Sequence, residues 1–156
     1  MCWSDEVVDR GRTMTNKTYK FGVYTINMPF MPGVFMFKQE SAMGKSRLGK
    51  MFKSMMIKDM PVACYTYRDL VEYRLTLEEY LKDRHIEVLL IDRYNLYYDK
   101  FHDTINKLVK SGCMVMIDLK NYQNKPEVIK NLDPELEDIQ IEFGEREVNL
   151  TLVEGE

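Results

Sequence analysis

The chain has 156 residues, of which 45% are hydrophobic and 30% charged, and its formal net charge is −3. This composition is typical of one soluble globular domain, and no apolar run approaches the roughly 18 residues that a membrane-spanning helix needs. Three widely spaced cysteines and two histidines argue against a disulfide framework, a thiolate zinc site or a histidine metal centre. The acidic start of the chain lacks the pattern of a secretory signal. These features predict a cytoplasmic protein without a membrane partner.

The polar, aperiodic residues 1–17 are expected to form a flexible N-terminal tail, which leaves 18–156 as a single domain. From there, β-rich or apolar runs bounded by turn residues predict strands, and apolar residues spaced three and four apart predict helices. The expected strands are 19–27, 34–38, 61–67, 87–92 and 113–119, followed by a hairpin formed by 139–143 and 148–152. The expected helices are 45–58, 69–84, a segment from Phe101 to Gly112, and a short helix after Pro126.

Strands that alternate with helices predict an α/β fold. Right-handed crossovers would place the strands in a mainly parallel sheet with helices on both faces, and the C-terminal β-hairpin would be added to it. Ligands of such sheets bind at the carboxyl ends of the strands. A site is therefore expected in the loops after Lys38, Tyr67, Asp92 and Leu119.

Charge is distributed unevenly along the chain. Residues 133–156 carry nine acids and one base, so residues 1–132 hold a net charge of +5. Six bases lie between Lys38 and Lys58, against one acid. Two interpretations of this density of positive charge are possible. The basic helix 45–58 either has a solvated face, or it presents a surface for an anionic ligand or a nucleic acid.

One segment carries a chemical motif. Residues 39–46 (QESAMGKS) follow the expected strand 34–38 and lead into the expected helix. Such a turn aims the N–H groups of a helix N-terminus at a phosphate, and it ends here in Gly44-Lys45-Ser46. The segment resembles the phosphate-binding loop, or Walker A motif, of P-loop NTPases. This resemblance implies ATP or GTP with Mg²⁺ as ligands.

The resemblance also implies a role for particular residues. Lys45 would meet the outer phosphates and Ser46 would bind Mg²⁺. The implied nucleotide-binding residues are Ser41, Ala42, Met43, Gly44, Lys45, Ser46 and Arg47. The run 88–92 (VLLID) resembles the second NTPase motif, Walker B, whose terminal Asp92 would hold Mg²⁺ with Ser46. Over residues 34–120 the chain resembles the additional-strand group, which includes AAA and ABC-type ATPases, and Asp118 or Lys120 would fall near its polar sensor position.

Three residues depart from the family pattern. Gln39 stands where the loop usually opens with glycine or alanine, Glu40 brings a carboxylate into the phosphate cradle, and Arg93 replaces a glutamate that polarises water in many members. Arginine is not a general base at neutral pH. We therefore expect a minimal or degenerate ATPase with weak or no hydrolysis, in which Asp92 and Asp118 are the candidate catalytic carboxylates.

Two other functions remain open. A non-catalytic protein-interaction or inhibitor protein, such as an accessory protein of a mobile element, would keep the fold and lose the nucleotide. Asp92-Arg93-Tyr94 also resembles the Asp-Arg-Tyr of thymidylate-type nucleoside monophosphate kinases, in which the arginine approaches phosphates. The expected partners are thus a nucleotide, an unidentified protein and, through helix 45–58, a nucleic acid.

Overall fold

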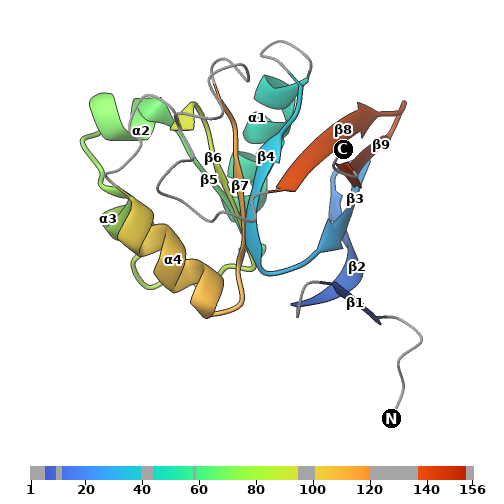
Figure 1. Cartoon of the computed structure of the whole chain (residues 1–156). Helices are drawn as coiled ribbons and strands as arrows, with labels where there is room; N and C mark the ends of the chain where they lie inside the picture. Colours follow the sequence, from blue (N-terminus) through green and yellow to red (C-terminus); the bar gives the residue numbers. More distant parts are fainter. Residues whose placement is uncertain are drawn as a thin grey trace.

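The computed structural model describes residues 6–9, 12–39, 44–57, 59–94, 101–119 and 137–153. Within them, one nine-stranded sheet and four helices make up the fold (Figure 1). The strands are β1 (Glu6–Asp9), β2 (Arg12–Phe21), β3 (Tyr24–Phe30), β4 (Gly33–Phe37), β5 (Val62–Tyr65), β6 (Val88–Ile91), β7 (Met114–Ile117), β8 (Glu137–Phe143) and β9 (Glu147–Val153). The helices are α1 (Lys45–Ile57), α2 (Tyr67–Val71), α3 (Leu77–Leu81) and α4 (His102–Lys110).

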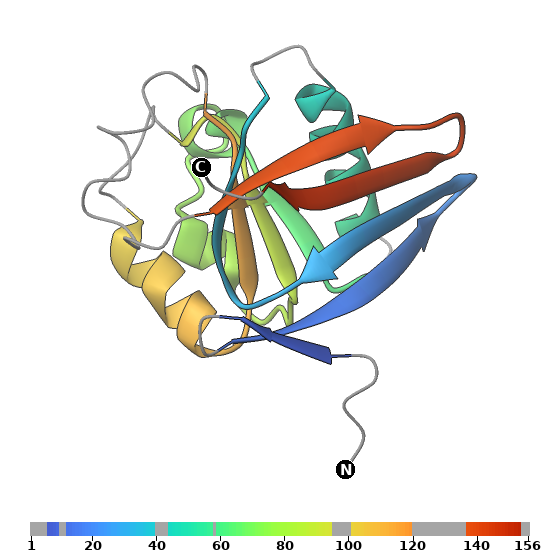
Figure 2. The ribbon, with the colours of Figure 1, turned by 45° about the vertical axis from the view of Figure 1, so that its right-hand side comes forward.

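The sheet joins two halves of different topology in the strand order β1-β2-β3-β9-β8-β4-β7-β6-β5. In one half, β8, β4, β7, β6 and β5 run parallel to one another. In the other half, β1 with β2, β2 with β3, and β8 with β9 pair antiparallel, whereas β3 and β9 are parallel. The strands twist relative to one another, and the sheet curls into a half-barrel (Figure 2).

The two faces of the parallel half bury different helices. Successive residues of a strand point to opposite faces, so Phe35 of β4 joins the cluster of Phe52 in α1, while its neighbour Met36 joins that of Ile105 in α4. The first cluster also includes apolar residues of the antiparallel half, such as Ile26. Helix α1 therefore packs on the concave side of the curled sheet, and α3 and α4 cover the opposite face (Figure 1).

The expectation of a mainly parallel α/β sheet of the P-loop NTPase type is wrong. Within the described residues strands predominate over helices, three strand pairs are antiparallel, and α2 and α3 are each five residues long. The difference arises because β1 to β3 and β9 add a curled half whose pairing depends on contacts distant in sequence. The expected C-terminal hairpin is confirmed, since β8 and β9 pair antiparallel.

The N-terminal region differs from the sequence-based expectation. Residues 6–9 and 12–17, assigned to a flexible tail, lie in β1 and in the first part of β2. The expected strand 19–27 is divided between β2 and β3, because the chain turns at Gly22, whose φ of +58° suits glycine. The long N-terminal hairpin that results forms much of the antiparallel half.

The expected elements of the parallel half are largely confirmed. Helix 45–58 is found as α1, and the strands 34–38, 61–67, 87–92 and 113–119 are found as β4, β5, β6 and β7. The expected helix 69–84 is instead two short helices, because Thr66 caps α2 and Thr76 caps α3, each in a reciprocal capping box. The helix expected after Pro126 lies outside the described residues.

Candidate functional site

A cavity of about 180 Å³ opens at the carboxyl ends of the parallel strands. After β4 the chain crosses to β5 at one edge of the sheet, whereas after β7 it crosses in the opposite direction, to β8 on the other side of β4. The direction of the crossover connections therefore reverses between the neighbouring strands β4 and β7. Ligands of open parallel sheets bind at such a reversal. The polar residues that line the cavity are Lys45, Ser46, Lys50, Lys53, Thr66, Asp92 and Asp118.

Lys45 is the first residue of α1 and is buried, with 4% of its surface exposed. Its Nζ lies 2.7 Å from Oδ1 of Asp118 and also donates a hydrogen bond to the carbonyl oxygen of Gln39, just after β4. A buried ammonium is costly unless it is paired and hydrogen-bonded. Asp118 and Gln39 therefore hold this cation at the cavity wall.

Asp92 and Asp118 are placed by the ends of neighbouring strands. The N–H of Asp92 donates to the carbonyl of Tyr65, and the N–H of Asp118 donates to the carbonyl of Ile91, both at 2.9 Å. The two side chains line the same cavity, and the charge of Asp92 acts on the carboxyl group of Asp118. Burial raises the pKa of Asp118 to about 6, the Asp92 carboxylate acts in the same direction, and Lys45 opposes both.

Gly44 adopts a conformation that favours glycine at the start of α1. Its φ is +97°, and a Cβ atom there would lie 2.3 Å from the ring of Phe143 in β8. Its carbonyl oxygen accepts the N–H of Leu48 at 3.1 Å, in the first turn of the helix. Gly44 therefore allows the backbone at the start of α1 to pass close to Phe143.

Arg47 is turned toward the antiparallel half and does not line the cavity. Its guanidinium lies 4.7 Å from the ring centroid of Phe143 and 5.1 Å from that of Tyr24, and it donates a hydrogen bond of 2.5 Å to the Tyr24 hydroxyl. These cation–π contacts occupy its charge. Of the basic residues in the motif, Lys45 lines the cavity and Arg47 does not.

The predicted magnesium ligands Ser46 and Asp92 line the same cavity. Ser46 is exposed and Asp92 half-buried. No group of three or more His, Cys, Asp or Glu suited to a metal ion occurs among the described residues. The remaining predicted binding residues, Ser41, Ala42 and Met43, lie outside the described residues, as do Glu40 and Lys120.

Gln39 has a structural role at the end of β4. Its side-chain amide donates to the carbonyl oxygen of Ile141 at 2.5 Å and accepts the N–H of Ile141 at 2.8 Å. The same β4–β8 ladder continues through the N–H of Lys38, which donates to Ile139. The side chain of Gln39 thus replaces one backbone pairing where β4 has ended.

Sequence reasoning missed the residues of the second cavity wall. Lys53 of α1 lies 2.9 Å from Asp69, whose Oδ2 accepts hydrogen bonds from the N–H and the hydroxyl of Thr66. Asp69 is 3% exposed and Thr66 follows β5. The spacing Thr66-x-x-Asp69 is the signal that predicts such a capping box. This network fixes Lys53 and Thr66 beside Asp92.

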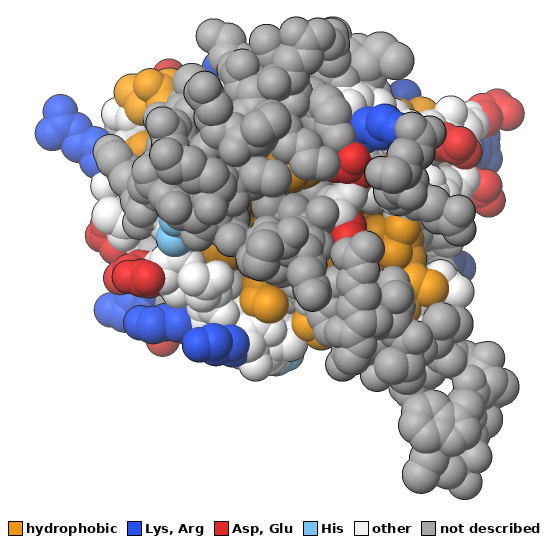
Figure 3. Space-filling model, in the orientation of Figure 1, with side chains coloured by type: hydrophobic (Ala, Val, Ile, Leu, Met, Phe, Trp, Pro, Cys, Tyr) orange, Lys and Arg blue, Asp and Glu red, His pale blue; other side chains and the backbone are white. Residues whose placement is uncertain are grey.

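The basic helix is not a continuous cationic face. Lys45 is paired with Asp118, Lys53 with Asp69, and Arg47 packs on two rings. Figure 3 shows basic side chains over α4 and acidic side chains toward the tip of the β8–β9 hairpin. The geometry therefore favours a small ligand at the cavity over a nucleic acid along α1.

Comparisons with known proteins do not assign the chain to a family. No family model, curated protein or solved structure matches it. Among the described residues, no helix combines the length and apolarity needed to cross a membrane.

Proposed function

We propose that the chain binds the phosphates of a nucleoside triphosphate, ATP or GTP, together with Mg²⁺ at the carboxyl ends of β4, β6 and β7. One observation carries the proposal: the lysine of the Gly44-Lys45-Ser46 motif lines one cavity with Asp92 and Asp118, which are distant in sequence. An ammonium supplies a cation for phosphate oxygens, and carboxylates supply oxygen ligands for Mg²⁺.

The dimensions of the cavity suit phosphates. Its 180 Å³ is below the range of about 300–1,000 Å³ found for pockets that enclose whole small molecules, so the nucleoside would lie outside it. Lys45 would exchange Asp118 for a phosphate oxygen, and Mg²⁺ at Ser46 and Asp92 would compensate the negative charge that gathers there. Binding is therefore expected to depend on Mg²⁺.

Turnover is expected to be slow. Arg93 follows Asp92 and does not accept a proton from water. Asp118 is the other carboxyl group of the cavity, and its pKa of about 6 suits a general base, so residual hydrolysis would depend on it. We expect hydrolysis well below the common range of about 1–1,000 s⁻¹.

The binding proposal is tested by calorimetric titration with a non-hydrolysable ATP analogue, with and without Mg²⁺. Lys45→Met should weaken binding about 10- to 100-fold, because a charge-assisted contact is lost. Lys107→Met, at an exposed lysine of α4, is the matched control and should leave affinity unchanged. Equal affinity of the wild type and Lys45→Met would refute the role of Lys45, and no binding at millimolar analogue would favour the non-catalytic interaction protein.

Asp118→Asn tests the same site through an expected gain in affinity for the analogue. If Lys45 must leave Asp118 to meet a phosphate, removing the carboxylate should tighten binding of the analogue. Phosphate release from ATP should fall in the same variant, because the candidate base is lost. Release at an ordinary ATPase rate by the wild type would show that turnover is not slow.

A further inference from the structure

A cleft of about 380 Å³ lies between β3 and β9, where the two strands separate. They pair over residues 25–27 and 147–149, and both strands continue beyond this pairing. Figure 2 shows them diverging toward their carboxyl ends. The cleft is lined along these diverging ends by Met28, Pro29, Leu150 and Thr151. Its volume is within the range of about 300–1,000 Å³ found for pockets that hold whole small molecules.

A row of polar side chains crosses the sheet at the closed end of this cleft. The strand register aligns one residue from each of β2, β3, β9 and β8, namely Thr18, Asn27, Asn149 and Glu142. Ile26, the neighbour of Asn27 along β3, belongs to the cluster around α1, so the row lies on the opposite, outer face of the sheet. The Thr18 hydroxyl donates to Oδ1 of Asn27 at 3.1 Å, and Nδ2 of Asn27 donates to Oδ1 of Asn149 at 2.9 Å. These two hydrogen bonds orient the amide of Asn149 at the end of the cleft.

The row presents hydrogen-bonding groups that its own members do not use. Within the described part of the chain, Nδ2 of Asn149 donates to no side chain, and the Glu142 carboxylate has neither a hydrogen bond nor an ion pair. These two residues face each other across the β8–β9 ladder, where directly opposed side chains are in contact range. An amide and a carboxylate side by side offer two N–H donors and several acceptors. A hydroxyl group is both donor and acceptor, so neighbouring hydroxyl groups of one ligand would satisfy both residues.

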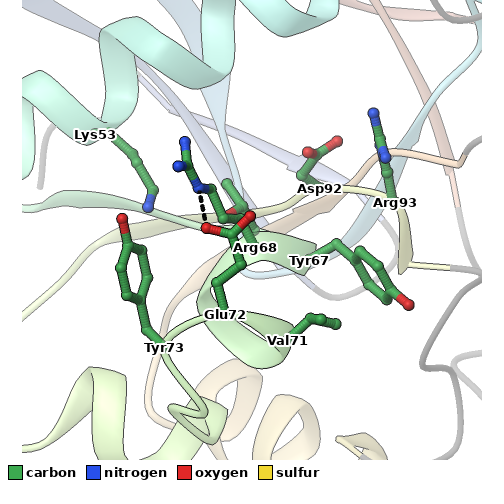
Figure 4. Close-up of a pocket in the computed structure, with 9 residues that line it drawn as sticks. Lys53, Tyr67, Arg68, Val71, Glu72, Tyr73, Asp92 and Arg93 are labelled. Carbon is green, nitrogen blue, oxygen red and sulfur yellow. Dashed lines mark hydrogen bonds and ion pairs between the residues drawn. The ribbon is translucent and has the colours of Figure 1, made fainter.

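Charge distinguishes this cleft from the larger pocket of about 540 Å³ beside the Lys45 cavity. Charged side chains of both signs line that pocket (Figure 4). The residues that line the cleft include two charged ones, Lys17 and Glu142. Nζ of Lys17 lies 2.5 Å from the carboxylate of Glu87, which is not part of the cleft. Glu142 is therefore the charged group that meets a ligand, and it would repel an anion.

Pro29 gives the cleft an apolar wall on the same face. It follows Asn27 by two residues and is half-buried, so its ring shares the outer face with the polar row. Proline has no N–H, so this part of β3 offers ring carbons where another residue would offer a donor. The cleft thus combines hydrogen-bonding groups at one end with an apolar wall, as the hydroxyl edge and the C–H face of a sugar ring require.

We propose that the cleft between β3 and β9 binds an uncharged polyhydroxylated molecule, a sugar of one or two rings. Asn149 and Glu142 would bind neighbouring hydroxyl groups, and Pro29 would contact the C–H face of the ring. The proposal does not depend on the triphosphate proposal, because no residue lines both the cleft and the Lys45 cavity.

The test is titration of ¹⁵N-labelled protein with glucose, galactose and mannose, followed by NMR. We expect saturable shifts of the side-chain amides of Asn27 and Asn149 with at least one of these sugars. Asn149→Ala and Glu142→Gln should each weaken binding about fivefold or more, because each removes hydrogen bonds to the ligand. Asn106→Ala, at an exposed asparagine of α4, is the matched control and should leave binding unchanged.

The charge of Glu142 has a probe of its own. The 6-phosphate of a sugar that binds should bind more weakly than the sugar itself, because its charge meets the carboxylate. Glu142→Gln should reduce this difference, which a purely structural role of Glu142 would leave unchanged.

Three results would overturn the sugar site. The first is the absence of saturation by all three sugars at tens of millimolar. The second is binding that Asn149→Ala and Glu142→Gln leave unchanged, or that the ATP analogue displaces, since the sugar would then lie elsewhere. The third is tighter binding of the 6-phosphate than of the sugar, which would make the cleft an anion site. Failure of the ATP analogue to bind, with normal sugar binding, would refute only the triphosphate proposal.

Discussion

Replacing Lys45 by methionine should destabilise the protein strongly at alkaline pH and little at acid pH. Methionine keeps the length of the side chain and removes its charge. The ion pair that it breaks is buried, with side-chain exposures of 2% for Lys45 and 12% for Asp118 and a separation of 2.7 Å. Without the ammonium, the Asp118 carboxylate loses the cation that opposes its burial and the charge of Asp92.

The magnitude follows from the state of Asp118. Removing one partner of a buried ion pair typically costs about 3–5 kcal/mol, against a total stability of about 5–15 kcal/mol for a domain. That cost requires an ionised carboxylate. Because the pKa of Asp118 is about 6, the carboxyl group is protonated and the pair is largely absent at about pH 5, whereas it is fully formed at about pH 8.

The assay is urea unfolding followed by circular dichroism at several pH values. We expect the loss of unfolding free energy in Lys45→Met to shrink from about 3–5 kcal/mol at about pH 8 to about 1 kcal/mol or less at about pH 5. Asp118→Asn in the same chain should recover much of the loss at high pH, and Lys107→Met is the control. An equal loss at both pH values, or additive effects in the double variant, would refute the pairing of Lys45 with Asp118 as the source of the effect.

Three further predictions concern the same region. Folding raises the pKa of Asp118 from 3.8 to about 6, so its contribution to stability is present below about pH 4 and is lost as the pH rises through about 6. Measured by urea unfolding, the free energy of unfolding of the wild type relative to Asp118→Asn should therefore fall by up to about 3 kcal/mol over that window. A difference that does not change with pH would contradict this prediction. Gly44→Ala should lower the free energy of unfolding by about 2 kcal/mol or more, since φ is +97° and Cβ would clash with Phe143. In thermal unfolding, adding Phe143→Ala to the same chain should recover the part of this loss that comes from the clash, but not the part that comes from the positive φ. Gln39→Ala should cost about 1–3 kcal/mol in urea unfolding, because it leaves the N–H and carbonyl of Ile141 without their amide partner; an unchanged midpoint would remove this role.

Local sequence patterns were sufficient for the parallel half of the sheet. Apolar runs and helical spacing predict β4, α1, β5, β6, α4 and β7 with small boundary errors, because each is set by residues close in the chain. The strand–loop–helix order also identifies Lys45 as a candidate site residue, and the ends of the expected strands identify Asp92 and Asp118. These residues are predictable because a strand end and a helix start are local features.

The tertiary structure decided what these residues contact. The strand order brings Asp118 close to Lys45, which is 73 residues away in sequence, and to Asp92, which is 26 residues away. Pairing between strands that are distant in sequence also makes the sheet mixed and curled. Packing of Phe143 against Gly44 likewise joins the start of α1 to the β8–β9 hairpin, and Arg47 packs on the same ring, outside the cavity. Periodicity reports which side of an element is apolar, but not which distant element will cover it, since that depends on the free energy of the whole packed arrangement.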